Sequence, residues 1–335
     1  MDYLGLLKGE QWIEISEDFN YVRATQDFVG LKLFPMAKTE NMKVAIIDLV
    51  EGGEIPVMAL VHAFDTEAQI GDRPDIKEFK AELLLVKQKL NQGEALRKKI
   101  NDAGMSREEE TIIREVYNDA ANLIAAVLTR FEAMADEALC TGKLHIVENN
   151  AEPVDVDYGL PAKHRLTVQN WSNAATDILG DLVKIKKASK NKIVRALVSD
   201  KVMGYILGNT VLGNIAAKQG EYLTEEFAKS YIQSKFGIEF VVVGGTYKLK
   251  HQSETEYNFF DEDTIVFLTT NGEVGKLFVT TTPEEDVNMG AVRTNGFVAV
   301  SQWIGTDPVT VWTKASAVGF PAFRNIKQLY ICSVK

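Results

Sequence analysis

The fold of this chain is decided by one stretch, SREEETIIREVYNDAANLIAAVLTRFEAMADEALC, which spans residues 106–140. It opens with a capping box, in which the side chains of Ser106 and Glu109 can each accept a hydrogen bond from the other residue's free backbone N–H. Apolar residues then recur every three or four positions as far as Leu139, and Gly142 follows where a left-handed residue would end a helix. The pattern predicts one helix of about 34 residues and roughly 50 Å, whereas a mean helix has about 11–12 residues. A coiled coil is the alternative, although the apolar stripe is wider than its two-position seam.

The rest of the chain alternates irregularly between strand-like and helix-like segments. Strands are expected at 42–64, 144–147, 154–156, 165–168, 193–198, 238–243, 297–303, 309–313 and 328–334, and helices at 174–185, 201–217 and 225–235. Asn271-Gly272 between two apolar runs, 266–268 and 277–279, predicts a β-hairpin. The segment 80–90 is either extended or helical. This irregular order indicates an α+β fold rather than a regular βαβ repeat.

Two N-terminal segments offer little to a core of their own. In residues 1–39, apolar clusters such as Phe28 to Phe34 are separated by polar stretches, and Pro35 stops any helix. We expect an arm that lies on something else. Further on, the chain runs out along 42–64, passes through a polar segment of about 14 residues, and returns; such excursions tend to be functional. Its charged residues are the candidate assembly contacts: Asp65, Glu67, Asp72, Arg73, Asp75, Lys77 and Glu78.

Composition and charge narrow the class of protein. With 46% hydrophobic and 25% charged residues among 335, the chain is an ordinary globular protein. A net charge of −10 argues against a surface that grips nucleic acid, although an acidic protein can enclose DNA that it repels. Cys140 and Cys332 fit no metal or redox spacing, so we expect buried thiols in a reducing compartment. Neither a signal peptide nor an apolar run long enough to cross a membrane is evident, and a cytoplasmic protein without membrane contact is expected.

The search for chemistry predicts no catalytic, cofactor or metal site. The four histidines are scattered, without HExxH spacing or pairing to cysteine. The segment 272–277 departs from the spacing of a phosphate loop and is better explained as a hairpin tip. Two acidic pairs, Asp155/Asp157 and Asp261/Asp263, could hold calcium but lack the twelve-residue loop with its terminal glutamate.

One basic cluster has two interpretations. It consists of Lys184, Lys186, Lys187, Lys190, Lys192 and Arg195, with no acidic residue among them. The favoured interpretation is a solvated helix end, where lysines complement the negative pole of the helix dipole. The alternative is an electrostatic contact with nucleic acid or an acidic partner.

Several stretches together resemble the lambda-type (protein E) family of phage major capsid proteins. The first runs from Ala138 through Thr141-Gly142-Lys143 to Val154-Asp-Val-Asp-Tyr-Gly159, the helix exit, strand and turn of that family. The second, residues 193–206, carries the strand, cap and helix of its Asp-Lys signature but lacks the family's tryptophan. The ending, 303–334, has the aromatic residue, the Asp-Pro turn, the small-residue stretch and the final strand. With the Leu-Phe-Pro segment at 31–35, the resemblance runs through the whole chain in order.

This resemblance implies a Hong Kong 97-like shell fold and its subdivision. Residues 1–39 would be the N-terminal arm and 40–91 the extended loop. The peripheral domain would comprise 92–171 and 294–335, with the spine helix at 106–140, and the axial domain 172–293. By the same analogy the arm would pack on neighbouring subunits, because it has nothing of its own to pack on.

The resemblance also implies a function and a set of partners. The chain would be a non-enzymatic major capsid protein that self-assembles, as pentamers and hexamers, into an icosahedral shell around double-stranded DNA. A separate scaffolding protein and a portal would assist assembly in the bacterial cytoplasm, and a decoration protein is left open. No covalent cross-link between subunits is expected, because no buried catalytic carboxylate is recognisable. The alternatives are an encapsulin-like compartment shell and, more remotely, an α+β hydrolase or ligand-binding protein.

Overall fold

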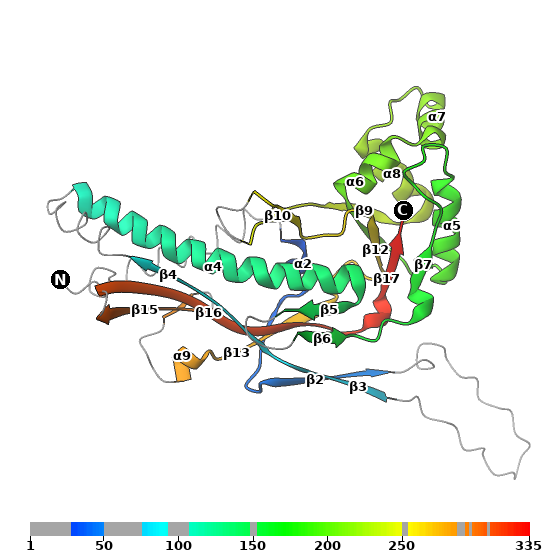
Figure 1. Cartoon of the computed structure of the whole chain (residues 1–335). Coiled ribbons are helices and arrows are strands. Elements are labelled where there is room, and N and C mark those ends of the chain that lie inside the picture. The colour runs from blue at the N-terminus through cyan, green and yellow to red at the C-terminus, as the bar shows by residue number, and fades with distance from the viewer. Residues whose placement is uncertain are drawn as a thin grey trace, which may run out of the picture.

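The protein is seen in a computed structural model that describes residues 28–49, 76–92, 107–147, 153–249, 254–286, 292–294, 297–306 and 309–335. Two main β-sheets meet near one end of a long helix, α4 (Arg107–Thr141), which lies along the molecule (Figure 1). Because α4 has 35 residues, the single long helix predicted from the sequence is confirmed. Among the described elements it packs on a sheet and on the short helix α2 (Val29–Leu33), not on a second long helix. The mixture of helices and strands confirms the mixed class of fold.

The larger sheet lies against α4. Its six strands are β1 (Met36–Lys38), β13 (Gly275–Thr280), β16 (Val309–Phe323), β15 (Val298–Thr306), β14 (Val292–Thr294) and β4 (Leu84–Gln92). The long strand β16 pairs with β4 along one edge, and with β15 and then β13 along the other. The segment 80–90, left open by its sequence, is therefore extended.

Small residues on β16 let α4 approach this sheet closely. Ala315, Ala317 and Gly319 occupy alternate positions and so share one face of the strand. A Cβ added at Gly319 would lie 3.2 Å from the ring of Phe131 on α4. The buried stripe of α4 that meets this core recurs every three or four residues: Leu123, Ile124, Val127, Leu128, Phe131, Met134, Ala135, Ala138 and Leu139.

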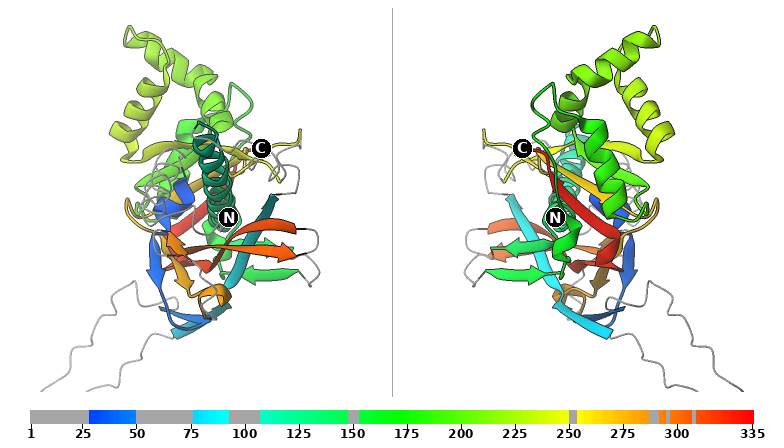
Figure 2. Two further views of the ribbon diagram at one scale, coloured as in Figure 1. Left: turned by 90° about the vertical axis from the view of Figure 1, so that its left-hand side faces the viewer. Right: turned by 90° about the vertical axis from the view of Figure 1, so that its right-hand side faces the viewer.

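The second sheet joins two hydrophobic cores. Its strands, in spatial order, are β7 (Arg165–Thr167), β17 (Leu329–Ser333), β12 (Thr264–Leu268), β8 (Arg195–Ser199) and β9 (Glu239–Val243). Side chains of β12 alternate between the cores, because Val266 and Leu268 face the cluster that contains α4, while Ile265 and Phe267 face a cluster of short helices. Those helices, α5 (Ile178–Ala188), α6 (Asp200–Leu207), α7 (Thr210–Lys218) and α8 (Glu225–Phe236), gather in one lobe (Figure 2).

Three two-stranded sheets lie outside the two main sheets. The pairs are β2 (Lys43–Leu49) with β3 (Ile76–Glu82), β5 (Lys143–Ile146) with β6 (Val154–Asp157), and β10 (Thr246–Tyr247) with β11 (Tyr257–Asn258). Helix α9 spans Pro283–Asp286.

The hairpin predicted at Asn271-Gly272 is wrong. β12 and β13, the strands on either side, lie in different sheets and do not pair with each other. The connection between them is bonded to distant segments instead. The N–H of Val274 donates to the carbonyl of Leu33, and the carbonyl of Val274 accepts from the N–H of Arg324. Both strands therefore find partners far away in sequence, which a local turn signal cannot reveal.

The single helix predicted over 201–217 is two helices. α6 ends before Gly208, and α7 begins after Asn209, whose side chain accepts hydrogen bonds from the N–H groups of Val211 and Leu212. The amide of Asn209 also donates to the carbonyls of Ala174 and Thr176. The chain bends here because Asn209 caps the second helix and is held by the segment before α5.

The expectation that the arm lacks an intramolecular partner is wrong for its described part. Helix α2 (Val29–Leu33) lies on α4, and β1 pairs in parallel with β13. Phe28, Leu31, Leu33 and Phe34 are each at most 5% exposed, within the core of their own subunit. These apolar residues belong to the fold because α4 and β13 offer them a surface that the arm sequence alone does not show. Residues 1–27 lie outside the described part.

Candidate assembly surfaces

The polar excursion predicted to contact neighbours is described only at its base. Asp65, Glu67, Asp72, Arg73 and Asp75 lie outside the described residues. Lys77 and Glu78 lie on β3, opposite Asp48 and Ile47 of β2 in an antiparallel register. The strands pair from Lys43 with Glu82 to Leu49 with Ile76, so the chain leaves and returns side by side, as expected. β2 and β3 form a sheet of their own beside the main body (Figure 1).

The basic cluster lies at the end of α5 and in the turn that leads to β8. Lys184 pairs with Asp181 at 2.9 Å, and Arg195 with Glu239 at 3.2 Å. The Nζ of Lys186 donates to the carbonyl of Phe236 at the C-terminus of α8. Lys192 also has a partner, so the structure gives four of the six cations local partners, while Lys187 and Lys190 are exposed.

The turn between α5 and β8 has an unusual backbone. Lys190 and Asn191 have φ angles of 53° and 61°, in the left-handed region that side chains other than glycine rarely adopt. The carbonyl of Lys186 accepts from the N–H of Asn191, so the helix end is closed by the backbone itself. Lys184, Lys186 and Lys187 therefore lie in the last two turns of α5, and Lys190 lies in the turn that follows it.

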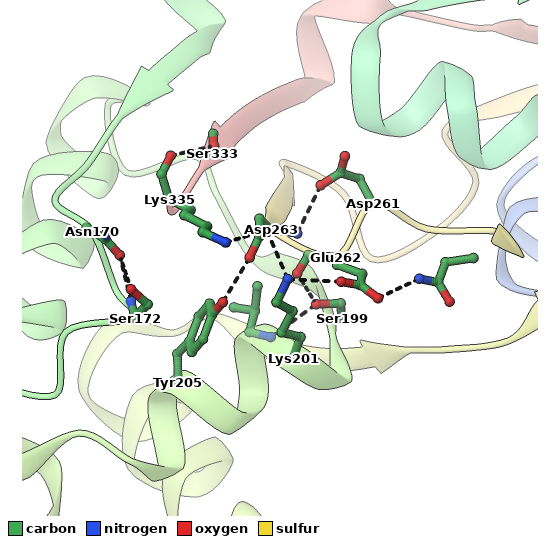
Figure 3. Close-up of polar contacts among 12 residues, drawn as sticks. Asn170, Ser172, Ser199, Lys201, Tyr205, Asp261, Glu262, Asp263, Ser333 and Lys335 are labelled. Carbon is green, nitrogen blue, oxygen red and sulfur yellow. Dashed lines mark hydrogen bonds and ion pairs between the residues drawn. The ribbon is translucent and has the colours of Figure 1, made fainter.

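A polar network that the sequence did not reveal ties the end of the chain to α6 (Figure 3). The Nζ of Lys201 lies 2.9 Å from Glu262 and 3.1 Å from Asp263, and the hydroxyl of Tyr205 donates to Asp263 at 3.0 Å. Lys335 approaches the same Asp263 at 3.9 Å. Burial acts to raise the pKa of Asp263, but the hydrogen bonds from Lys201 and Tyr205 outweigh it and the pKa is lowered. The network is therefore structural: its opposite charges neutralise one another and hold the end of the chain against α6.

The acidic pairs considered for calcium have other partners. Asp155 bonds with His145, and Asp157 pairs with Lys143 at 2.9 Å. Asp261 accepts from the backbone N–H of Asp263, whose own carboxylate belongs to the Lys201 network. Within the described ranges no group of three or more potential metal-ligating side chains is found. Both cysteines are free and buried, as expected from their spacing.

One face of the six-stranded sheet carries aromatic and cationic side chains. Trp303 and Trp312 stack from neighbouring strands with ring centroids 6.2 Å apart, and the Nζ of Lys89 lies 4.3 Å from the ring of Trp312. Lys314 pairs with the buried Glu284 of α9, which also accepts from Ser316. Lysine ammonium groups beside tryptophan rings are attracted to the ring faces, so these contacts hold the neighbouring strands together.

A buried acidic pair was also missed. Glu132 and Asp136, one turn apart on α4, are 2% and 1% exposed. The available signal was two carboxylates at i and i+4 beside the apolar stripe of a helix, which is an unusual place for charge.

No described helix is long and apolar enough to span a membrane.

Two solved structures share this fold. The putative capsid protein of a prophage of E. coli CFT073 matches with a TM-score of 0.60 and 15% identity, covering 96% of this chain and 99% of that chain. A phage-related protein of Bordetella bronchiseptica RB50 matches with a TM-score of 0.56 and 12% identity, covering 94% and 95%. At such low identity the likeness concerns the fold alone.

The sequence comparisons decide the family. Among curated proteins no match is found. The family model of phage major capsid protein E matches residues 14–334, which is nearly the whole chain and includes every described element. The fold agrees with that match, since both structures above are phage-related and one is a putative capsid protein. The chain therefore belongs to the phage major capsid protein E family and is a shell subunit of a tailed bacteriophage.

Proposed function

We propose that this capsid protein builds a closed icosahedral shell of the Hong Kong 97-like type, from pentamers and hexamers, around double-stranded DNA. The observation that carries the proposal is the shape of the subunit within its family. A two-stranded sheet, β2–β3, stands apart from two sheets joined by one long helix. Such an element has few contacts within its own chain, so contacts between copies must offset the entropy of ordering it. A closed shell supplies those contacts to every copy.

The proposed subdivision follows the resemblance seen in the sequence. Residues 1–39 are the arm, 40–91 the extended loop, 92–171 and 294–335 the peripheral domain with α4 as its spine, and 172–293 the axial domain. Several strands cross these limits: β1, β4 and β13 lie in the six-stranded sheet, and β7 and β17 lie in the five-stranded sheet. The hairpin β2–β3 is therefore the proposed base of the extended loop.

The proposed partners follow from the function. A separate scaffolding protein and a portal assist assembly in the host cytoplasm, and a decoration protein remains a candidate partner of the virion shell. DNA is enclosed without sequence-specific contact, which suits a chain with a net charge of −10. A wall protein of this kind needs neither a cofactor nor a catalytic site.

Replacement of residues 65–75 by a short Gly/Ser turn tests the role of the loop. Because Ile76–Glu82 stays paired with β2, we expect the isolated subunit to fold with nearly unchanged Tm, since a shorter loop alters closure entropy only slightly. Shell formation, followed by negative-stain microscopy with the scaffold present, should fail. A control variant that keeps the residues of 65–75 but in scrambled order retains the native loop length, and so separates the effect of the loop's sequence from that of its length. Normal shells from the shortened chain would refute the loop assignment, and an unfolded subunit would place the segment in the core.

For the basic cluster we propose a structural role at the helix end, not a DNA contact. Lys187 and Lys190 are exposed and can be changed without breaking the bonds of Lys184, Lys186 or Arg195. The double variant Lys187→Gln, Lys190→Gln should leave the yield of DNA-filled heads unchanged. A drop in packaged DNA with intact shells would instead favour the nucleic-acid contact.

A further inference from the structure

Two carboxyl groups are buried on the face of α4 that carries the arm. Glu132 and Asp136 lie one helical turn apart and are almost fully excluded from solvent. Neither oxygen of the Asp136 carboxyl has a hydrogen-bond partner among the described residues. A buried ionised carboxylate without partners is costly, so such a group either gains a proton or forces its surroundings to open.

Glu132 replaces the missing cap of helix α2. The residue before that helix, Phe28, has no side chain able to cap it. The two carboxylate oxygens of Glu132 instead accept from the N–H of Gly30 at 2.8 Å and of Leu31 at 2.7 Å. A carboxylate at the positive end of a helix is stabilised by these free N–H groups. The arm is therefore fastened to α4 by two hydrogen bonds to the carboxyl oxygens of Glu132.

Gly30 covers the acidic pair. A Cβ added at this position would lie 2.8 Å from the Cβ of Ala135, 3.0 Å from an oxygen of Asp136 and 3.1 Å from an oxygen of Glu132. The backbone of α2 thus lies directly on the carboxyl groups, and only glycine fits there. Water can reach Asp136 from this side only if α2 moves away from α4.

The two groups differ in what holds their protons. Burial raises the pKa of Glu132 to about 7, although the backbone N–H groups of residues 29–31 and the ammonium of Lys32 act to lower it. Burial also raises the pKa of Asp136 well above its ordinary value, the neighbouring charge of Glu132 adds to this effect, and among the described residues no N–H group donates to Asp136 to offset it. Near neutral pH the pair therefore holds at least one proton, and Asp136 is the group that keeps it.

The charged surroundings of the pair are few. Lys32 of α2 is the cation that acts on Glu132. On α4 itself, the thiol of Cys140 lies close enough to Asp136 to have its pKa raised by that carboxylate, and Asp261 acts on the same thiol from the segment before β12. None of these groups neutralises a second negative charge at Asp136, because among the described residues the charge that acts on it is that of Glu132, which is also negative.

We propose that Glu132 and Asp136 form a proton-controlled anchor that holds residues 28–34 on the spine helix. With Asp136 neutral, Glu132 caps α2 and the apolar side chains of Phe28, Leu31 and Phe34 stay buried. With both groups ionised, two unneutralised carboxylates share one dry site, and lifting α2 lets water relieve them. The segment then exposes its apolar residues to other molecules.

The sign of the pH dependence follows from these shifts. A carboxyl group whose pKa is raised in the folded state binds its proton more tightly there than in the released state. Its contribution to docking is complete below its ordinary pKa, near 4–4.5, and is lost as the pH rises through the raised value. For Glu132 that point is about 7, and for Asp136 it lies well above its ordinary value. The arm segment should therefore be held more firmly in acid than in mildly alkaline solution.

Hydrogen exchange on the unassembled wild-type subunit between pH 6 and 9 tests the anchor. After correction for the intrinsic rate, exchange in a peptide covering residues 28–34 should rise by up to about tenfold per pH unit, the limit for release of one proton. A peptide from β16 should not change. In Asp136→Asn, which keeps the size of the side chain but cannot ionise, the rise should be reduced to what Glu132 alone contributes.

Further variants keep the experiment decisive. Asp136→Ala serves if the asparagine variant does not fold, and Glu226→Gln, an exposed acid on α8, is the matched control that should behave as wild type. Unchanged protection of 28–34 in the wild type, or the same rise in Asp136→Asn, would overturn the proposal. So would equal loss of protection in β16, because the pair would then act on the whole fold. The measurement uses single subunits, so its failure leaves the capsid function untouched.

Discussion

At the scale of single residues, Glu262 lies between a lysine and an asparagine, the two residue types that an isopeptide bond can join, but the protonation states do not allow that reaction. Its carboxylate lies between Lys201 Nζ, at 2.9 Å, and the side-chain amide of Asn258, at 2.7 Å. Joining that lysine to that asparagine, with loss of ammonia, requires an uncharged amine and a carboxyl group that can donate a proton. Here the hydrogen bonds to Glu262 and Asp263 raise the pKa of Lys201, and the bond from Lys201 lowers the pKa of Glu262. Both groups are held in the wrong protonation state.

We therefore predict that no isopeptide bond forms between Lys201 and Asn258 beside Glu262, within or between subunits. Intact mass spectrometry should give the mass of the sequence without loss of ammonia, and boiled shells should run as one band near 37.2 kDa. Asn258→Ala, which removes the acceptor, should give the same mass pattern relative to its own sequence. A ladder of higher species that survives reductant, and that disappears in Asn258→Ala, would contradict this prediction.

At the scale of elements, the junction of the arm with the six-stranded sheet is too closely packed to admit an added side-chain atom at Gly275. A Cβ at Gly275, the first residue of β13, would lie 2.2 Å from the carbonyl oxygen of Ala322 and 2.5 Å from the ring of Phe34. The ring of Phe34 also packs edge-on against Phe323 at 5.1 Å. The arm, β13 and β16 thus meet at one glycine, which was not recognisable as special because its neighbours come from three distant segments.

Gly275→Ala should lower the free energy of unfolding by about 1–3 kcal/mol, the usual cost of overpacking a core. Gly213→Ala is the matched control, because a Cβ there meets nothing within 4 Å and the residue lies in helix α7. That change should be neutral or stabilise by up to about 1 kcal/mol. Thermal unfolding of both variants provides the comparison, and equal Tm values for the two would show that the contact at Gly275 is not restrictive.

At the scale of the whole molecule, the five-stranded sheet makes one structure of two cores. Neighbouring residues of β12 serve different clusters: Phe267 packs among the short helices, and Leu268 packs in the cluster that contains α4. Strand β17, near the end of the chain, pairs with β12 in the same sheet. A substitution that destabilises either core should therefore also destabilise the other, because side chains of the same strands belong to both cores.

Two substitutions test this coupling. Phe267→Ala should cost about 3–5 kcal/mol and Leu268→Ala about 2–5 kcal/mol, since both side chains are fully buried. Each variant should still unfold in a single transition, at a lower temperature, with circular dichroism and tryptophan fluorescence changing together. Two separate transitions in either variant would mean that the cores fold independently.

The sequence by itself determined the elements whose signals are local. The helix of α4 follows from the apolar spacing over 106–140, and α8 from Thr224, whose side chain caps it as the residue type predicts. The ordered resemblance along the chain was enough to indicate the capsid family. These features depend on residues close together in sequence, where side-chain periodicity and capping leave a pattern.

Only the tertiary structure decided which segments meet. The strands beside Asn271-Gly272 separate into two sheets because each pairs along both edges with distant strands, β12 with β8 and β17 and β13 with β1 and β16, so the local turn does not set their pairing. Helix α2 is capped by Glu132, about a hundred positions along the chain, and Lys201 meets Glu262 and Asp263 through the same kind of long-range closure. A hydrogen bond or ion pair between remote segments leaves no periodicity in the sequence, and its existence depends on the packing that brings the two segments together.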